Sequence, residues 1–315
     1  MRTRQAILVG PQRFEIEEKE IAPGPGELLV RMEGCGLCHS ESPKWRGPAQ
    51  YPVVMGHEGY GVVVECGPKT LGRFSPGDRV TGLHGQSFAD YYVAQELQAI
   101  KIRADLSQKV VPGEPLYCVQ NVVRAARPEI GDCVAVLGCG PMGLWAIQAL
   151  AYPALKALVA VDIDEDKLAL ASSFGATHGI NPKTCDPIER MKEISDGRLA
   201  DVVVEGSGSA AGVQLATDLL RWKRPRLVIM SGYWKSKVEV DLHMLANKAV
   251  ELLGAHPGIC LDRNDGIRRT EILINNGTFK SDSMVTHRFP LEKIQEAFES
   301  MEQRPAGYVK GIVVP

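Results

Sequence analysis

The stretch VAVLGCGPMG, residues 134–143, decides the fold of this chain. An apolar run ends in Gly138, Gly140 and Gly143, which have the spacing G-x-G-x-x-G, and an apolar segment of helical length follows. In a turn from a strand to a helix, the first glycine permits the tight bend, the second lets a pyrophosphate approach the backbone, and the third lets helix and strand pack closely. Pro141 suits the first helical position, where its missing N–H needs no partner. The stretch therefore predicts a dinucleotide site, with the diphosphate bound by backbone N–H groups at the start of the helix.

The residues that follow this turn alternate between strand-like and helix-like segments. The runs ALVAVDID, DVVVEGSG, RLVIMSG and VELLGAH are typical of strands, and EDKLALASSFGA and AAGVQLATDLLRW between them are typical of helices. Such alternation predicts a doubly wound parallel sheet with helices on both faces. We expect this Rossmann domain to cover residues 117–256.

An acidic residue ends the second strand of this domain. Asp162 lies about 20 residues beyond the glycine turn, where a carboxylate accepts hydrogen bonds from the adenosine ribose of a dinucleotide. The alternative is that it only caps the following helix. A carboxylate repels the 2′-phosphate of NADP, and no arginine follows in DIDEDK, residues 162–167. The pattern therefore favours NAD over NADP.

The N-terminal part of the chain is rich in short β-prone runs, such as RQAILVG and ELLVRMEGCG, separated by turn signals such as PGPG. Many short strands with little helix predict a barrel or a compact sandwich. The length of 315 residues suggests about two domains at roughly 150 residues each. We predict an α/β protein with a β-rich domain over residues 1–116, to which residues 257–315 return.

The composition narrows the function and the location. The formal net charge is −2, and basic residues form no long tract, which argues against nucleic acid as the main partner. No apolar stretch approaches the roughly 18 residues of a membrane span, and the N-terminus lacks the core of a signal peptide. Eight cysteines in a chain of this length suggest free thiols in a reducing compartment, so we expect a cytoplasmic protein.

Two cysteines stand close together in GCGLCHSES, residues 34–42. A disulfide, half of a zinc finger, a redox pair and a single metal ligand are all conceivable. A zinc finger needs a second pair of ligands at suitable spacing, which the sequence lacks, and thioredoxin-type pairs belong to a different βα setting. A catalytic zinc instead takes three ligands from scattered positions. VVMGHEGYG offers His57 and Glu58, and VVPGEPLYC offers Glu114 and Cys118.

This combination resembles the zinc-dependent medium-chain alcohol and polyol dehydrogenases, of the sorbitol and threonine dehydrogenase kind. The resemblance covers nearly the whole chain and includes, in family order, GCGLCHS, GHEGYGVVVECG, SPGDRV, GEPLYC, VLGCGPMG, VDID and YVKGIVV. It implies that the β-rich part is a GroES-like catalytic domain. It also implies a homodimer or homotetramer, because relatives pair their dinucleotide domains edge to edge.

The resemblance further implies the metal ligands. Cys38, His57 and Glu114 match the three zinc ligands, and Glu58 matches a residue that in relatives ligates zinc or exchanges with its water. Taken singly, a cysteine in a barrel is usually a core residue, and a histidine beside a glutamate is usually a surface pair. We expect the remaining cysteines, which are Cys35, Cys66, Cys118, Cys133, Cys139, Cys185 and Cys260, to be small buried residues.

Two departures from the family pattern matter. Many relatives carry a lobe of four cysteines that binds a structural zinc, and TGLHGQSFADYYVA stands there without a cysteine, so we expect one zinc per chain. The family pairs a Ser or Thr with a later histidine for proton transfer. Ser40 is present, but Pro43 holds the later position, so the proton leaves through water or another side chain, for which Glu41 and Lys44 are the nearby candidates.

The expected reaction is hydride transfer between a secondary alcohol and NAD, with a polyol, cyclitol or aminocyclitol favoured. The zinc acidifies the substrate hydroxyl and Ser40 accepts its proton, with Glu58 as a second catalytic residue. The resemblance implies the following cofactor-binding residues: Gly138, Gly140, Pro141, Met142, Gly143, Asp162, Lys167, His39 and Lys310. His39 is equally well explained as an exposed loop residue.

Two alternative functions remain open at this stage. One is a zinc-free NADPH-dependent quinone or enone reductase of the same superfamily, and the other is a non-catalytic NAD-binding protein. The segment ESPKWRGPAQYP, residues 41–52, is expected to line the substrate pocket through Lys44 and Trp45, unless it is a plain surface loop.

Overall fold

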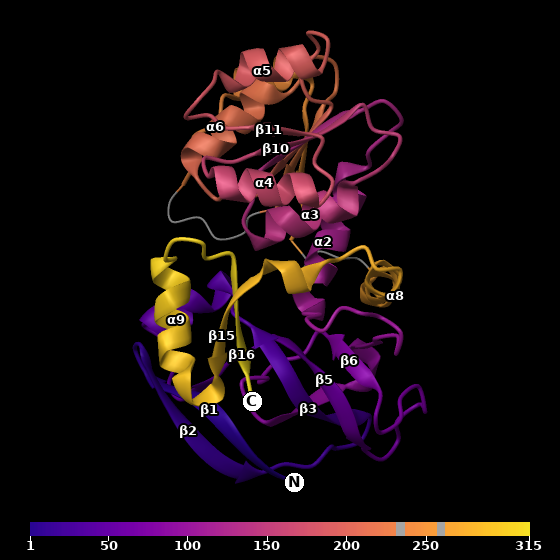
Figure 1. Ribbon diagram of the computed structural model, residues 1–315, viewed down its shortest axis with the longest axis vertical. Helices are drawn as coiled ribbons and strands as arrows, with labels where there is room; N and C mark the ends of the chain where they lie inside the picture. Colours follow the sequence, from indigo (N-terminus) through magenta and orange to yellow (C-terminus); the bar gives the residue numbers. More distant parts are fainter. Residues whose placement is uncertain (231–236, 257–261) are drawn as a thin grey trace. The chain divides into compact units, whose positions relative to one another are not determined.

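The computed structural model describes residues 1–230, 237–256 and 262–315. The chain divides into two compact units, one formed by Met1–Tyr117 with Asp262–Pro315 and the other by Cys118–Leu261. Each unit is described by itself (Figure 1). The domain boundaries expected after residues 116 and 256 stay predictions.

The first unit is built from β-sheet. A small antiparallel sheet has the strand order β2-β1-β4, and a larger sheet has the order β15-β16-β3-β5-β6-β8, with β7 paired to β3. The strands are β1 (Arg2–Gly10), β2 (Arg13–Glu20), β3 (Glu27–Gly36), β4 (Val53–Val54), β5 (Glu58–Cys66), β6 (Arg79–Gly82), β7 (Tyr91–Gln95), β8 (Ala99–Lys101), β15 (Val285–Pro290) and β16 (Lys310–Val314). The C-terminal strands thus enter the sheet that begins near the N-terminus.

The helices of this unit are few. They are α1 (Ser42–Arg46), the start of α2 (Gly113–Ala126), α8 (Arg263–Asn275) and α9 (Ile294–Gln303), with short 3₁₀ turns at η1 (His39–Glu41), η2 (Glu96–Gln98), η4 (Ser281–Met284) and η5 (Leu291–Lys293). Helix α9 turns Phe298 into the core, where its ring contacts Phe14, Trp45 and Phe88 at centroid distances of 5.0–5.9 Å. This aromatic cluster ties the C-terminal helix to residues from the first ninety.

The second unit contains a six-stranded parallel sheet with the order β11-β10-β9-β12-β13-β14. Its strands are β9 (Cys133–Leu137), β10 (Ala157–Val161), β11 (His178–Ile180), β12 (Val202–Glu205), β13 (Arg226–Ile229) and β14 (Glu251–Gly254). Its further helices are α3 (Pro141–Leu150), α4 (Glu165–Ser173), α5 (Pro187–Ile194), α6 (Ala210–Leu219) and α7 (Leu242–Lys248). Numbered within the unit, the order is 3-2-1-4-5-6, the doubly wound arrangement of dinucleotide-binding folds.

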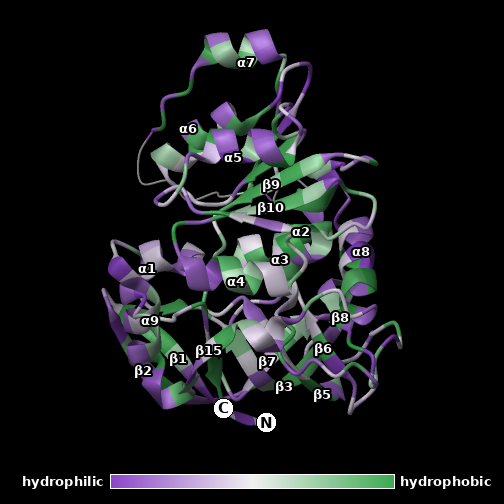
Figure 2. Ribbon diagram, turned by 45° about the horizontal axis from the view of Figure 1, so that its top comes forward, coloured by the Kyte–Doolittle hydropathy of each residue, from purple (hydrophilic) through white to green (hydrophobic). Residues whose placement is uncertain are grey.

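The composition of the strands is typical of a parallel sheet. All residues of β9 and β10 are buried, and Figure 2 shows both strands as mostly hydrophobic. Strands buried on both faces are continuous apolar runs, because helices cover each side. Helices α3 and α4 lie on one face of the sheet and α5 and α6 on the other (Figure 1). The predicted fold class, a GroES-like β-rich domain with a doubly wound Rossmann domain, is confirmed.

Candidate active site

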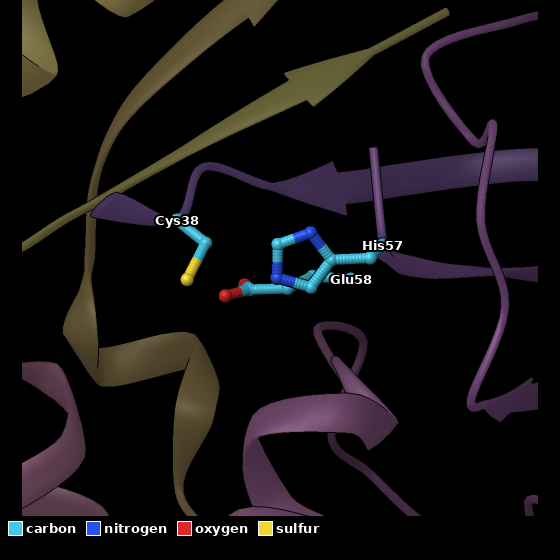
Figure 3. A group of neighbouring side chains, drawn as sticks. All are labelled: Cys38, His57 and Glu58. Carbon is cyan, nitrogen blue, oxygen red and sulfur yellow. The ribbon is translucent and has the colours of Figure 1, made fainter. Parts of the chain in front are cut away.

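Three predicted side chains meet at one point of the first unit. The sulfur of Cys38, a ring nitrogen of His57 and a carboxylate oxygen of Glu58 all lie within 4.8 Å of one another (Figure 3). Cys38 follows the end of β3, and Glu58 opens the antiparallel partner strand β5, where it stands opposite Gly36. The pairing of these two strands therefore brings together residues that are separate in the sequence.

The imidazole of His57 is oriented by a buried carboxylate. Oε1 of Glu41 lies 3.1 Å from Nδ1 of His57 and accepts the backbone N–H of Gly56 at 2.7 Å. A metal-ligating histidine is usually fixed in this way, because a carboxylate on one ring nitrogen sets the tautomer and leaves the other nitrogen for the metal. Glu41 is 5% exposed, so water competes little for this bond.

The surroundings of His57 favour a positive charge. Burial opposes protonation, but the hydrogen bonds to the Cys38 sulfur and the Glu41 carboxylate outweigh burial and raise the pKa of His57 to about 12. From the sequence, Glu41 was considered only as a candidate for proton transfer and not as the partner of His57. The spacing could have indicated this role, because the short turn η1 places Glu41 three residues after Cys38.

Glu114 lies beside this group. Its Oε2 is 3.8 Å from Nε2 of His57, and it belongs to the first turn of α2. The start of α2 is fixed because the N–H of Gly113 donates to Thr81 Oγ1 at 2.7 Å, and that hydroxyl donates to the carbonyl of Gly59 at 3.2 Å. Glu114 is therefore held beside His57, but it is not part of the group of donor atoms that lie within 4.8 Å of one another.

Lys310 forms a buried ion pair with Glu58. Its ammonium lies 2.6 Å from Glu58 Oε2 and donates to the carbonyl of Leu37 at 2.8 Å. The side chains of Glu58 and Lys310 are 1% and 6% exposed. The sequence suggested Lys310 as a cofactor contact, which stays a prediction. The ion pair between Lys310 and Glu58 was not foreseen.

Ser40 also reaches the site. Its hydroxyl lies 3.3 Å from the Cys38 sulfur and 3.4 Å from Nε2 of His57. The hydroxyl therefore lies close to both the sulfur and the imidazole. A thiolate, an imidazole and carboxylates form a donor set that suits zinc.

His39 points elsewhere. Its Nε2 accepts from the guanidinium of Arg304 at 2.6 Å, and its Nδ1 lies 3.4 Å from the Ser42 hydroxyl. Burial and then the neighbouring charge of Arg304 lower the pKa of His39 to about 4, so the ring is neutral near pH 7. Its contact with a pyrophosphate stays a prediction, and Arg304 is a cationic neighbour that the sequence did not indicate.

Trp45 is 4% exposed and belongs to the core, because α1 turns its indole toward Phe298. Its expected place in a substrate pocket stays a prediction, whereas one expectation about the cysteines is wrong. Cys185 is exposed rather than buried. Cys66 and Cys118 are partly buried, whereas Cys35, Cys133 and Cys139 are buried as expected. Cys260 lies outside the described residues.

The glycine turn of the second unit has the conformation that its spacing requires. Gly138 has a φ of 87°, which favours glycine. A Cβ on Gly143 would lie 1.9 Å from the carbonyl oxygen of Gly138, so a side chain there would separate helix and strand. A Cβ on Gly140 would meet nothing within 4 Å. Helix α3 begins at Pro141, with Met142 next in its first turn, and Gly140 provides no side-chain cap. Open space thus adjoins uncapped N–H groups, which suits a diphosphate.

Asp162 bridges this turn and the next loop. It accepts the N–H of Cys139 at 2.6 Å and the N–H of Asp164 at 3.0 Å. The cap of α4 is Asp164, which accepts from the N–H groups of Asp166 and Lys167. Asp162 is therefore not a helix cap. The ammonium of Lys167 pairs with Asp164 at 3.4 Å, and its role in cofactor binding stays a prediction.

Two known protein families match the two regions described above. Residues 24–104 match the family described as alcohol dehydrogenase GroES-like domain, and residues 141–262 match the family described as zinc-binding dehydrogenase. The first range includes Cys38, His57 and Glu58, and the second includes most of the Rossmann unit.

Individual proteins are similar over nearly their whole length. Erythritol/L-threitol dehydrogenase of Mycolicibacterium smegmatis is 30% identical, with 94% of this chain and 93% of that protein covered. Sorbitol dehydrogenase of Halalkalibacterium halodurans is 26% identical, with 97% of each covered. A solved structure described as a zinc-binding dehydrogenase of Sinorhizobium meliloti 1021, bound to NADP, is 25% identical with a TM-score of 0.86 and full coverage of both chains.

Proposed function

Because the chain belongs to the zinc-type medium-chain alcohol and polyol dehydrogenase family, we propose that it transfers a hydride between a polyol and NAD, with one zinc ion at the Cys38 site. The observation that carries the proposal is the convergence of Cys38, His57 and Glu58, with Glu114 beside His57. The relatives that act on erythritol, threitol and sorbitol support a polyol as the substrate class.

In this proposal Cys38 and His57 would hold the zinc together with a carboxylate, Glu114 or Glu58, and Glu41 orients His57. A zinc ion there is a Lewis acid that lowers the pKa of a substrate hydroxyl. Ser40 accepts the proton of that hydroxyl, for which its position beside Cys38 and His57 is suitable. Pro43, in place of the family's histidine, accepts no proton, so Ser40 passes the proton to water.

The cofactor is bound through the second unit. The nicotinamide ring supplies the hydride acceptor. Backbone N–H groups at the start of α3 bind the diphosphate, and the space above Gly140 admits it. Asp162 accepts hydrogen bonds from the adenosine ribose, and its charge disfavours a 2′-phosphate. Because the structural relative is bound to NADP, the test compares NAD and NADP directly.

One assay tests the proposal. Purified protein is supplied with erythritol, threitol, sorbitol, ethanol or a quinone, each with NAD and with NADP and their reduced forms, while the zinc content of the same preparation is measured. We expect polyol-dependent reduction of NAD that a chelator abolishes and added zinc restores. Reduction of quinone by NADPH in zinc-free protein would contradict it.

A further inference from the structure

A buried threonine of the first unit joins two segments that carry the proposed metal site. Thr81, which lies on β6 and is 0% exposed, accepts the N–H of Gly113 at 2.7 Å and donates to the carbonyl of Gly59 at 3.2 Å. Gly59 directly follows Glu58 on β5. Gly113 directly precedes Glu114 on α2. One hydroxyl therefore connects the backbones beside the two carboxylates of the site.

The two ends of this connection are held differently. Gly59 belongs to β5, where the ladder with β3 pairs it with Cys35, so the sheet already sets its position. Gly113 is the first residue of α2, where backbone N–H groups have no partner within the helix. The N–H of Gly113 takes its acceptor from β6 instead, so Thr81 fixes the start of α2 to the sheet.

The helix start approaches β6 too closely to carry a side chain. A Cβ on Gly113 would lie 2.6 Å from the backbone nitrogen of Gly82 and 2.7 Å from the hydroxyl oxygen of Thr81. The residue after this close contact is Glu114, and its Oε2 lies 3.8 Å from Nε2 of His57. The position of the carboxylate therefore depends on the contact between the helix start and the strand.

We propose that Thr81 is a positioning residue that holds Glu114 beside His57 in the metal site. The inference rests on the proposed function, in which Glu114 is one of two candidate carboxylate ligands. Thr81 acts through the backbone at Gly113. A ligand that is held in place before the metal arrives loses less freedom on binding, so the metal is bound more tightly.

The test replaces zinc by cobalt(II), whose visible absorption reports its ligands, and measures the affinity for cobalt by competition with a chelator. Thr81→Val keeps the shape of the side chain without the hydroxyl. We expect its affinity to fall by about tenfold, as for one buried hydrogen bond, and its absorption bands to shift. Thr81→Ser keeps the hydroxyl and should retain affinity within about twofold. Gly113→Ala displaces the helix start, should also weaken affinity, and decides the matter if Thr81→Val does not fold.

Thr270 provides a control for a merely structural effect. It is 0% exposed in the same unit, and its hydroxyl donates to the carbonyl of Gly266 within α8 at 2.8 Å. Thr270→Val also loses a buried hydrogen bond, but it should leave the affinity for cobalt and the absorption bands unchanged.

A double variant shows whether Thr81 acts through Glu114. Glu114→Gln alone should lower the affinity, and Thr81→Val added to it should lower it by less than about twofold further, because the carboxylate to be positioned is already absent. Unchanged affinity in Thr81→Val or Gly113→Ala, an equal loss in Thr270→Val or Thr81→Ser, or a full further loss in the double variant would overturn the inference alone. A wild-type protein that shows no cobalt–thiolate absorption would refute the proposed zinc site, and the inference with it.

Discussion

The proposed metal site of the first unit and the glycine turn of the second are built on opposite principles. At the metal site, side chains hold one another: Glu41 holds His57, and Lys310 holds Glu58. At the turn, the backbone is what matters: Gly140 borders open space, and the N–H groups at the start of α3 are the groups proposed to bind the diphosphate. One site therefore depends on the identity of charged groups, and the other on the absence of side chains.

The comparison teaches which changes each site tolerates. Removal of one charged partner at the metal site leaves another buried charge unpaired, which costs several kcal/mol or rearranges the ligands. At the turn, a small side chain is harmless where space is open and disruptive where backbone atoms are in contact. The predictions below use this difference, from the largest expected effect to the smallest.

Loss of a ligand should have the largest effect. His57→Ala removes the imidazole donor, so we expect zinc to be lost and polyol turnover to fall by about a thousand-fold or more, since a Lewis acid supplies several kcal/mol. Zinc content and NAD reduction measure this. His243→Ala, at an exposed position on α7, is the matched control and should change neither. Full zinc content in His57→Ala would show that His57 is not a zinc ligand.

Loss of the orienting carboxylate should have a smaller effect. Glu41→Gln keeps a carbonyl oxygen for the N–H of Gly56 but removes the charge that faces His57. We expect zinc affinity, measured by competition with a chelator, to fall by about 10–100-fold. Glu302→Gln, which alters a carboxylate beside His39, should leave zinc affinity unchanged. Equal affinities of Glu41→Gln and wild type would remove Glu41 from the site.

The two glycines of the turn should separate folding from binding. Gly143→Ala places a Cβ against the Gly138 carbonyl, so we expect a loss of about 1–3 kcal/mol in the free energy of unfolding. Gly140→Ala meets open space and should change that free energy by less than about 0.5 kcal/mol. Denaturant titration measures both. NAD titration of Gly140→Ala should still show weaker binding, because the new methyl group occupies the space proposed for the diphosphate.

The smallest effect is expected at the ribose position. Asp162→Asn keeps the shape of the side chain and removes its charge, so we expect the KM for NAD to rise by about tenfold, as for one charged hydrogen bond. The preference for NAD over NADP should shrink as well. Steady-state kinetics with both nucleotides measure this. A wild-type enzyme that prefers NADP would contradict the assignment of Asp162.

The sequence predicted the turn well because its geometry is contained in ten consecutive residues. The spacing of Gly138, Gly140 and Gly143 is itself the structural requirement, and the position of Pro141 at the start of α3 followed from it. The alternation of strands and helices likewise predicted the parallel sheet, since each segment is apolar over its own length.

The metal site was less accessible from the sequence. The resemblance named Cys38 and His57, but the pairing of Lys310 with Glu58 depends on the strand order β16-β3-β5, which no local pattern contains. The burial of Trp45 was not predicted for a related reason. Its segment is short and polar in composition, and only the packing of α9 shows that the indole faces inward.

The most direct test measures zinc content and polyol-dependent NAD reduction on the same preparations of wild type and Cys38→Ser. The account predicts about one zinc ion per chain with turnover in the wild type, and loss of both in a folded Cys38→Ser protein. Undiminished polyol oxidation in protein that contains no zinc would contradict it.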